Sequence, residues 1–274
     1  MEANLQRRIQ RYGWDRAVGS YEDGWKANLA PAQNQLLLMA EAWPNEQVVD
    51  LACGTGLVTL PLAHAVGCSG RVVATDISER MIETVLAEAK EMDLPQINAL
   101  RADAESLDMI PDASIDLVTC ALGLMYVANP LRTLQEAYRV LKPGGRAVFA
   151  VWGERRKCGW AEIFPIVDAR VHSSVCPLFF RLGTGQTLAK EMETAGLYGI
   201  ETARIASQLD YPDDQSALLA AFAGGPVALA YHRFDDETRD AVHDEYLKSI
   251  RPFRAARGYK ISGEFVVCRG FKPV

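Results

Sequence analysis

Four features are missing from this 274-residue chain, and each absence narrows what the chain can do. Its six cysteines show no C-x-x-C spacing, so we expect a reduced, cytoplasmic protein with no metal site. No uncharged apolar run is long enough to span a membrane, and the first residues lack the apolar core of a signal peptide, so we expect no membrane partner. Lys and Arg (29) are fewer than Asp and Glu (35), and the net charge of −6 argues against a nucleic acid partner.

The residues that are present have the composition of a globular protein. Hydrophobic residues make up 49% of the chain and charged residues 23%. The length suits one large α/β domain with insertions better than two small domains.

A glycine-rich loop follows the first strand-like run. Val48–Leu51 is apolar apart from Asp50, a small-residue turn follows, and a helical pattern begins at Leu57. Glycines allow the backbone to approach a ligand closely, and the start of a helix leaves N–H groups free to bind it. The dinucleotide fingerprint G-x-G-x-x-G is broken, because Thr59 stands where its third glycine would be. A nucleotide-like ligand is expected, but a nicotinamide cofactor is disfavoured.

Two motifs connect this pattern to a known family. Asp50–Gly56 resembles the D-x-x-C-G-T-G motif of class I S-adenosylmethionine-dependent methyltransferases. Glu136–Gly145 resembles the E-x-x-R-V-L-K-P-G-G signature of small-molecule methyltransferases of the ubiquinone/menaquinone-biosynthesis type. The second motif has a structural meaning: a helix, a turn and the next strand. The resemblance covers roughly residues 48–152.

Asp76 is a candidate ligand for a ribose. It ends the strand-like run Val72–Asp76, about 20 residues after Gly56, which is the spacing at which α/β nucleotide folds present an acid to ribose hydroxyls. A carboxylate accepts two hydroxyl hydrogen bonds, which suits a vicinal diol. The alternative is that Asp76 caps the next helix, but Ser78 fills that role well.

Asp103 and Ala104 follow the third strand-like run, residues 97–102. In the resembling family an acid at this place meets the amino group of adenine, and the neighbouring backbone meets the ring. A buried amine without an acceptor costs about 1–3 kcal/mol, so an acid is chemically apt. A helix-capping role for Asp103 remains the alternative.

The resemblance implies an S-adenosylmethionine site at the ends of several strands. We expect it to contain Tyr21, Asp50, Ala52, Gly54, Gly56, Asp76, Ile77, Met81, Asp103, Ala104, Ala121 and Leu122. Tyr21 follows an A-x-x-Y-like pattern with one extra residue. An aromatic face beside the sulfonium cation contributes roughly 0.5–2 kcal/mol, although the N-terminal aromatics could equally pin a helix onto the core.

No catalytic side chain stands out. Methyl transfer is an in-line displacement in which the cofactor supplies the chemistry and the protein supplies position. Where the acceptor needs a base, histidine is the obvious residue type. The candidates for a catalytic role are His172, His232 and Tyr126, whereas we expect His64 to be structural and His243 to be solvated.

The fold expected is α/β, a seven-stranded, mostly parallel Rossmann-like sheet with its last strand antiparallel, helices on both faces and helical lid insertions. Residues 1–274 would form a single methyltransferase domain. It would have an N-terminal helical cap (1–47), a cofactor-binding core (48–152) and a substrate-side half (153–274) with a helical insertion at 213–250. The sixth strand is expected at 200–205, and the last, at 264–271, between the fifth and the sixth.

The function expected is methyl transfer from S-adenosylmethionine to a small-molecule acceptor. The alternatives are a protein that only binds this cofactor, or an enzyme that uses it for chemistry other than methyl transfer. A nicotinamide-dependent oxidoreductase ranks below both.

Overall fold

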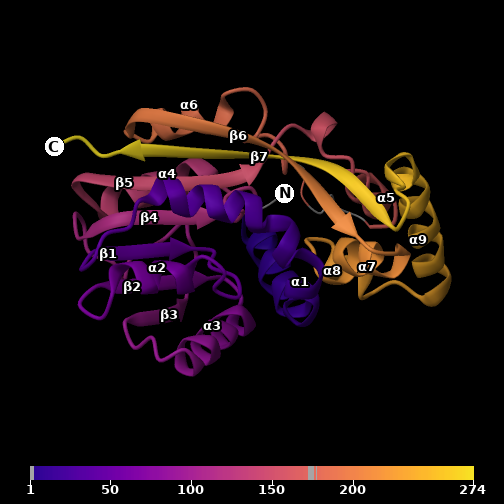
Figure 1. The fold of residues 1–274 in the computed structure, drawn as a ribbon, viewed down its shortest axis with the longest axis horizontal. Coiled ribbons are helices and arrows are strands. Elements are labelled where there is room, and N and C mark those ends of the chain that lie inside the picture. Colours follow the sequence, from indigo (N-terminus) through magenta and orange to yellow (C-terminus); the bar gives the residue numbers. More distant parts are fainter. Residues whose placement is uncertain (1–2, 172–175, 177) are drawn as a thin grey trace.

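The computed structural model describes residues 3–171, 176 and 178–274, and its centre is a seven-stranded sheet (Figure 1). The strands are β1 (Gln47–Leu51), β2 (Arg71–Asp76), β3 (Ile97–Arg101), β4 (Ile115–Ala121), β5 (Leu141–Trp152), β6 (Tyr198–Tyr211) and β7 (Tyr259–Phe271). Their order across the sheet is β3-β2-β1-β4-β5-β7-β6. The pairs from β3 to β5 are parallel, and β7 is antiparallel to both β5 and β6. The predicted fold class, with the last strand antiparallel between the fifth and sixth, is confirmed.

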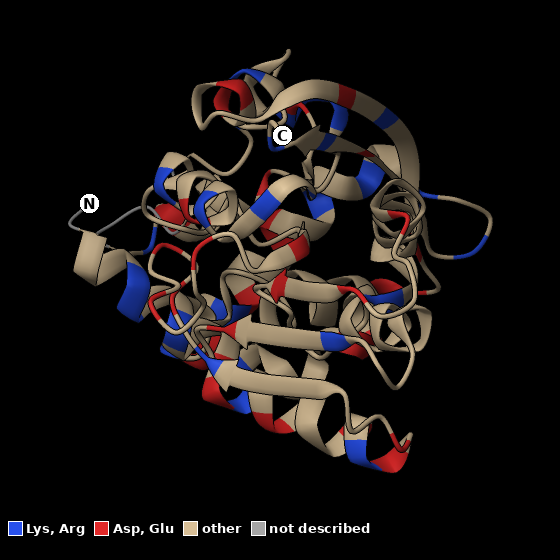
Figure 2. Cartoon of the chain, turned by 90° about the vertical axis from the view of Figure 1, so that its left-hand side faces the viewer, with Lys and Arg blue, Asp and Glu red and all other residues tan. Residues whose placement is uncertain are grey.

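The helices surround this sheet. They are α1 (Ala3–Ala40), α2 (Thr59–Val66), α3 (Glu79–Glu91), α4 (Pro130–Val140), α5 (Ile163–Asp168), α6 (Thr187–Thr194), α7 (Asp214–Leu218), α8 (Ala228–Tyr231) and α9 (Asp236–Ile250), with short turns η1 (Arg155–Lys157), η2 (Leu219–Ala223) and η3 (Arg251–Phe253). Acidic and basic residues are mixed along the helices and loops (Figure 2). Within the described ranges, no helix has both the length and the apolar content that crossing a membrane requires.

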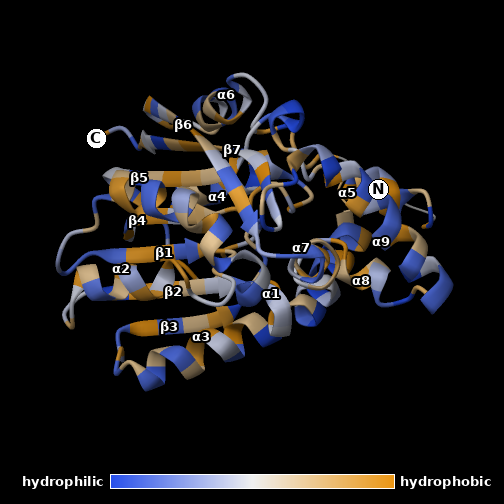
Figure 3. Ribbon diagram, turned by 45° about the vertical axis from the view of Figure 1, so that its right-hand side comes forward, coloured by the Kyte–Doolittle hydropathy of each residue, from blue (hydrophilic) through white to orange (hydrophobic). Residues whose placement is uncertain are grey.

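Successive side chains of each strand point to opposite faces of the sheet, and an apolar core lies on each face. Val48 packs in the core that contains Leu62 of α2 and Val85 of α3. Its neighbour Val49 packs in the other core, with Leu134 of α4. Successive strand residues point to opposite faces, so a parallel strand covered on both sides reads as a continuous apolar run. Figure 3 shows this concentration of apolar residues in the central strands, and the two-coloured α3 beneath them.

The turn before the fifth strand differs in detail from the expectation. We expected 142–145 to be a turn and the strand to begin at Arg146, but β5 begins at Leu141. Its pairing with β4 jumps from Ile115–Leu141 to Leu117–Arg146, so 142–145 bulge out of the ladder. Gly144 has φ of 76°, a conformation that favours glycine.

The last two strands are longer than the sequence suggested. The sixth strand was expected at 200–205 and spans Tyr198–Tyr211, and the last begins at Tyr259 rather than at 264. Many residues of β6, an edge strand, are exposed, so it lacks a clear apolar signal. The extended ends of these strands reach the region of α7 and α9 (Figure 1).

Helix α1 links this helical region to the sheet. The indole N–H of Trp25 donates to the carbonyl of Ala220 in η2 at 3.0 Å, and the side chain of Asn28 accepts from the backbone N–H of Asp210 at 2.9 Å. On the other side, the hydroxyl of Ser78 donates to Asp15 at 2.6 Å. Helix α1 therefore lies between the glycine-loop half and the C-terminal helices.

Candidate functional site

A cavity opens at the carboxyl ends of β1 to β4, beneath α1. It encloses about 730 Å³ of empty space, counting the part open to solvent. Ten of the twelve residues predicted for the cofactor line it: Tyr21, Ala52, Gly54, Asp76, Ile77, Met81, Asp103, Ala104, Ala121 and Leu122. Ligands of open α/β sheets bind at this edge, and we call this space the cofactor cavity.

Asp76 stands in the wall of the cofactor cavity, at the end of β2. One carboxylate oxygen accepts the backbone N–H of Ser78 at 2.9 Å, and the other accepts that of Gly54 at 3.0 Å. Burial raises the pKa of Asp76 to about 6, although these hydrogen bonds counteract the rise. Ser78 caps α3 by accepting from Met81 at 3.2 Å, so the capping role belongs to Ser78.

Asp50 and Gly56 do not line the cofactor cavity. Asp50 is 1% exposed, and its two oxygens accept the hydroxyls of Thr59 and Thr119, each at 2.7 Å. Burial raises its pKa to about 6. The threonine that breaks the dinucleotide fingerprint therefore holds the first acid of the loop in place. Gly56 has φ of 94°, and a Cβ there would lie 3.3 Å from Val85, so its role is in the backbone.

A smaller pocket of about 280 Å³ adjoins the cofactor cavity and shares Tyr21, Ala52, Gly54 and Ala121 with it. Asp50 lines this pocket, together with Thr55. The hydroxyl of Thr55 is buried and has no hydrogen-bond partner. A carboxylate and a free hydroxyl in one pocket suit a ligand end that carries both an amine and a carboxylate. The two pockets together therefore fit the nucleoside and the amino-acid part of S-adenosylmethionine.

The side chain of Asp103 is 29% exposed and already contacts other groups of the protein. It accepts the backbone N–H of Glu105 at 2.9 Å and lies 2.5 Å from Nε of Arg7. A carboxylate has about four acceptor positions, so room for a ligand amine remains. Arg7 also contacts Glu105 at 2.7 Å, and it lines the cofactor cavity with Gln10. No local pattern marks these two residues of α1, because the strand ends that form most of the cavity begin at Ala52, more than 40 residues further along the chain.

A second cavity of about 330 Å³, which we call the aromatic chamber, lies against the first. It is lined by Trp14, Tyr21, Trp25, Leu29, Leu122, Tyr126, Trp152, Trp160, Gly225 and Pro226, none of which carries a charge. Trp14, Tyr21, Leu122 and Tyr126 line both spaces. The ring of Trp14 meets those of Tyr21 and Tyr126 edge to face, at 5.8 and 5.1 Å between centroids.

The sequence interpretation missed two of these chamber tryptophans, Trp152 and Trp160, whereas Trp25 was one of the N-terminal aromatics considered for either a ligand or core packing. Trp152 ends β5, and the rule that ligands lie at the carboxyl ends of parallel strands could have found it. Trp25 and Trp160 come from α1 and from the segment before α5, and no local pattern joins them. Their rings are 5.7 Å apart between centroids.

The two tyrosines of the shared wall have raised pKa values. Burial raises the pKa of Tyr21, and the nearby charge of Asp76 adds to this rise. Burial also raises the pKa of Tyr126 well above its usual value. Both phenols are therefore protonated at neutral pH, and Tyr126, one of the catalytic candidates, does not supply a phenolate base.

The structure describes one of the two histidine candidates for a catalytic role, His232. His172 lies outside the described residues. His232 is exposed, its Nε2 lies 2.7 Å from a guanidinium nitrogen of Arg16, and it lines neither cavity. His243, expected to be solvated, is half-buried with Nε2 2.9 Å from the hydroxyl of Tyr231, and burial lowers its pKa. Within the described ranges there is also no cluster of three or more His, Cys, Asp or Glu that could hold a metal ion.

Comparison with known proteins agrees with this geometry. The family described as "Methyltransferase domain" matches residues 49–149. The demethylmenaquinone methyltransferase of Listeria welshimeri is 35% identical over 117 residues, which are 43% of this chain and 49% of that protein. The chain thus spans about half the length of the curated relatives it matches.

Solved structures share the fold at low sequence identity. Phosphoethanolamine N-methyltransferase 2 of Haemonchus contortus, in complex with phosphomonomethylethanolamine and S-adenosylhomocysteine, has a TM-score of 0.59 and 15% identity, covering 95% of this chain and 58% of that one. The [4+2]-cyclase SpnF has a TM-score of 0.55 and 19% identity, covering 88% and 81%.

The fold and the family match point to the same class: residues 49–149 match the methyltransferase domain family, and the sheet has the strand arrangement expected of the class I, S-adenosylmethionine-dependent type. Within that class, the similarity is to methyltransferases of quinone biosynthesis.

Proposed function

We propose that this chain transfers a methyl group from S-adenosylmethionine, bound in the cofactor cavity, to a small molecule in the aromatic chamber. One observation carries this proposal: Trp14, Tyr21, Leu122 and Tyr126 line both spaces. An in-line displacement requires donor and acceptor on opposite sides of the methyl group, in contact and without water between them. A shared wall between a polar and an aromatic space provides that arrangement.

On this proposal each cofactor group has a residue that suits it. Asp76 accepts the ribose hydroxyls, Asp103 accepts the adenine amine, and Asp50 with Thr55 holds the amino-acid end. The bound cofactor supplies an electrophilic methyl group. The chain's own residues orient it, exclude water and surround the cation with aromatic faces, each contributing roughly 0.5–2 kcal/mol.

The chamber favours a flat, uncharged acceptor, because its lining is aromatic or aliphatic and carries no charge. The matched relatives are named demethylmenaquinone methyltransferases, which makes the ring of a reduced quinone our preferred acceptor. The cytoplasmic location and the division into 1–47, 48–152 and 153–274 stay predictions from the sequence.

Two measurements test the proposal. Isothermal titration with S-adenosylmethionine should show binding to the full chain. Incubation with methyl-labelled cofactor and reduced demethylmenaquinone or 1,4-dihydroxynaphthalene should move label into the organic product. Absence of cofactor binding by the wild-type protein would refute the proposal.

A second candidate is an enzyme or sensor that binds the cofactor without transferring its methyl group. The structural similarity to a [4+2]-cyclase is the reason to consider this candidate, because the fold alone does not specify methyl transfer. Tight cofactor binding combined with no labelled product, either from these acceptors or from a cell extract, would favour it. A nicotinamide enzyme is disfavoured, because Thr59 fills the third glycine position and binds Asp50.

A further inference from the structure

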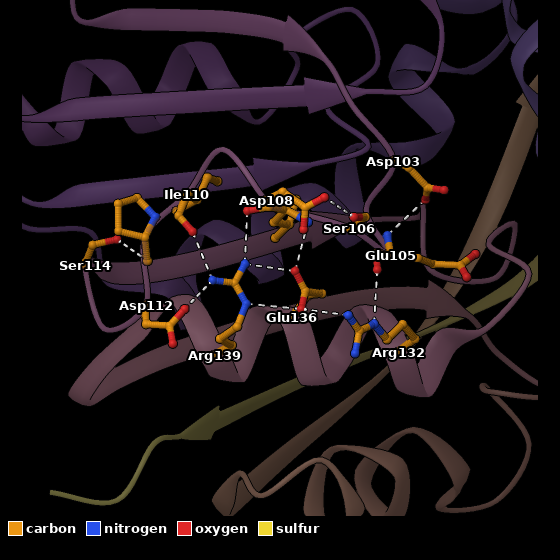
Figure 4. A network of polar contacts seen from close by, with 12 residues as sticks. Asp103, Glu105, Ser106, Asp108, Ile110, Asp112, Ser114, Arg132, Glu136 and Arg139 are labelled. Atoms are coloured by element: carbon orange, nitrogen blue, oxygen red, sulfur yellow. Dashed lines mark hydrogen bonds and ion pairs between the residues drawn. The ribbon is translucent and has the colours of Figure 1, made fainter.

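The loop between β3 and β4 forms one wall of the cofactor cavity. Ala102, Asp103, Ala104 and Glu105 line the space, and the chain then runs across α4 before β4 begins (Figure 4). Two side chains of α4 form hydrogen bonds with this loop: Glu136 and Arg139, the Glu and Arg of the E-x-x-R part of the signature. Neither residue lines the cavity.

Glu136 is a nearly buried carboxylate, 3% exposed, on the face of α4 beneath the loop. It accepts the backbone N–H of Leu107 at 2.8 Å and makes two hydrogen bonds to the guanidinium of Arg139, at 2.9 and 3.1 Å. The hydrogen bonds from Arg139 hold the pKa of Glu136 below its usual value. The carboxylate is therefore ionised at neutral pH and stays paired with Arg139.

Arg139 adds further bonds to the loop backbone. Its guanidinium donates to the carbonyls of Leu107 and Ile110, each at 3.0 Å, and to the carboxylate of Asp112 at 2.5 Å. Arg132, two turns before Arg139 on α4, donates to the carbonyl of Glu105 at 3.3 Å. The planar fork of an arginine suits such simultaneous contacts, which the single ammonium of a lysine does not reproduce.

We propose that Glu136 and Arg139 are positioning residues that fix the adenine end of the cofactor site without touching the cofactor. This inference rests on the proposed function. Glu136 holds the N–H of Leu107, a residue that is fully buried and lies four positions after Asp103. Without the negative charge of Glu136 the hydrogen bonds from Leu107 and Arg139 weaken, and the loop gains freedom to move Asp103 away from the ligand.

The experiment measures binding of two probes, S-adenosylhomocysteine and 5′-methylthioadenosine, by isothermal titration. Both carry the adenosine moiety, but only the first carries the amino-acid end. We expect Glu136→Gln and Arg139→Ala to weaken both probes by about tenfold and by equal factors. Arg139→Lys, which keeps the charge but carries its donors on a single nitrogen, should recover part of the loss. Hydrogen exchange in 103–112 should rise in the same order.

Arg146→Lys is the matched control. Arg146 also forms a double hydrogen bond with a carboxylate, Glu46, both at 2.8 Å, and also donates to a backbone carbonyl. It stands near the amino end of β5, the edge of the sheet opposite the cavity. The Arg146→Lys variant should have a lower melting temperature, but its affinity for both probes should stay within twofold of the wild type.

The outcomes separate the two proposals. Wild-type protein that binds neither probe overturns the proposed function and this inference with it. Wild-type protein that binds both, with folded Arg139 variants that bind as tightly as Arg146→Lys, overturns the positioning role alone. A loss confined to S-adenosylhomocysteine also overturns it, because the loop faces the adenine end. Should Glu136→Gln fail to fold, the two Arg139 variants decide.

Discussion

The cofactor cavity and the aromatic chamber share a wall, but they are built by different means. The cavity takes most of its residues in short runs from the ends of β1 to β4, and its polar side chains include the carboxylates of Asp76 and Asp103 as well as Arg7 and Gln10 of α1. The chamber takes single side chains from α1, from β5, from the segment before α5 and from 225–226. The cavity is therefore suited to recognise hydrogen-bonding groups, and the chamber to recognise shape and aromatic surface.

This difference predicts that changes on the two sides of the wall are separable. A substitution in the cavity should change cofactor affinity. A substitution in the chamber should change use of the acceptor and leave the cofactor bound as before. The following expectations run from the largest effect to the smallest.

Asp76→Ala should weaken S-adenosylmethionine binding by about 100-fold or more. It removes a charged acceptor of two hydroxyl hydrogen bonds, each contributing about 1.5–3 kcal/mol. Isothermal titration measures the effect, and Asp116→Asn, which changes an acid outside the cavity, is the control. Retained affinity in a folded Asp76→Ala variant would contradict the ribose role.

Trp160→Phe should raise the KM for a quinol acceptor by about tenfold while cofactor affinity stays within twofold. The smaller ring leaves a void among aromatic side chains, and loss of stability of about 1–3 kcal/mol accompanies it. Steady-state kinetics with 1,4-dihydroxynaphthalene, together with cofactor titration, provide both numbers. An equal fall in cofactor affinity would show that the two spaces are not separable.

Acid should weaken cofactor binding. The pKa of Asp76 is raised to about 6, and only the ionised carboxylate accepts both hydroxyls, so affinity falls as the pH drops through 6. Between pH 7 and pH 5.5 the loss is about fourfold for this one group. Titration across this range checks it, and a flat profile in the wild type would count against the assignment.

Acid should stabilise the ligand-free protein, although it weakens cofactor binding. Burial also raises the pKa of Asp50 to about 6, so in the ligand-free protein the native state binds more protons than the unfolded chain between about pH 4 and 6. These two groups therefore make the free energy of unfolding larger as the pH falls through that window.

His232→Ala should have the smallest effect, with kcat and cofactor affinity within twofold of the wild type. The imidazole is exposed, pairs with Arg16 and lies at neither cavity. A loss of kcat of tenfold or more, measured with a labelled cofactor, would instead restore His232 as a base.

The local sequence predicted most of the elements that build the cofactor cavity. The positions of the strands along the chain, the glycine loop and the acids that end successive strands follow from apolar periodicity and from turn residues, which act over a few neighbouring positions. The order of the strands across the sheet was implied by the family resemblance. Ten of the twelve residues that the resemblance implies for the cofactor line the cavity. Asp50 differs, because its position relative to Thr119 depends on how β1 and β4 pair.

The sequence by itself determined a parallel α/β sheet with a nucleotide-like site at its carboxyl edge, since each strand carries its own part of that site. Only the tertiary structure decided where the acceptor space lies. Trp25 and Trp160 meet at 5.7 Å although 135 positions separate them, and packing of α1 against the C-terminal helices brings them together. Contacts of this kind depend on how whole elements pack, and no local periodicity encodes them.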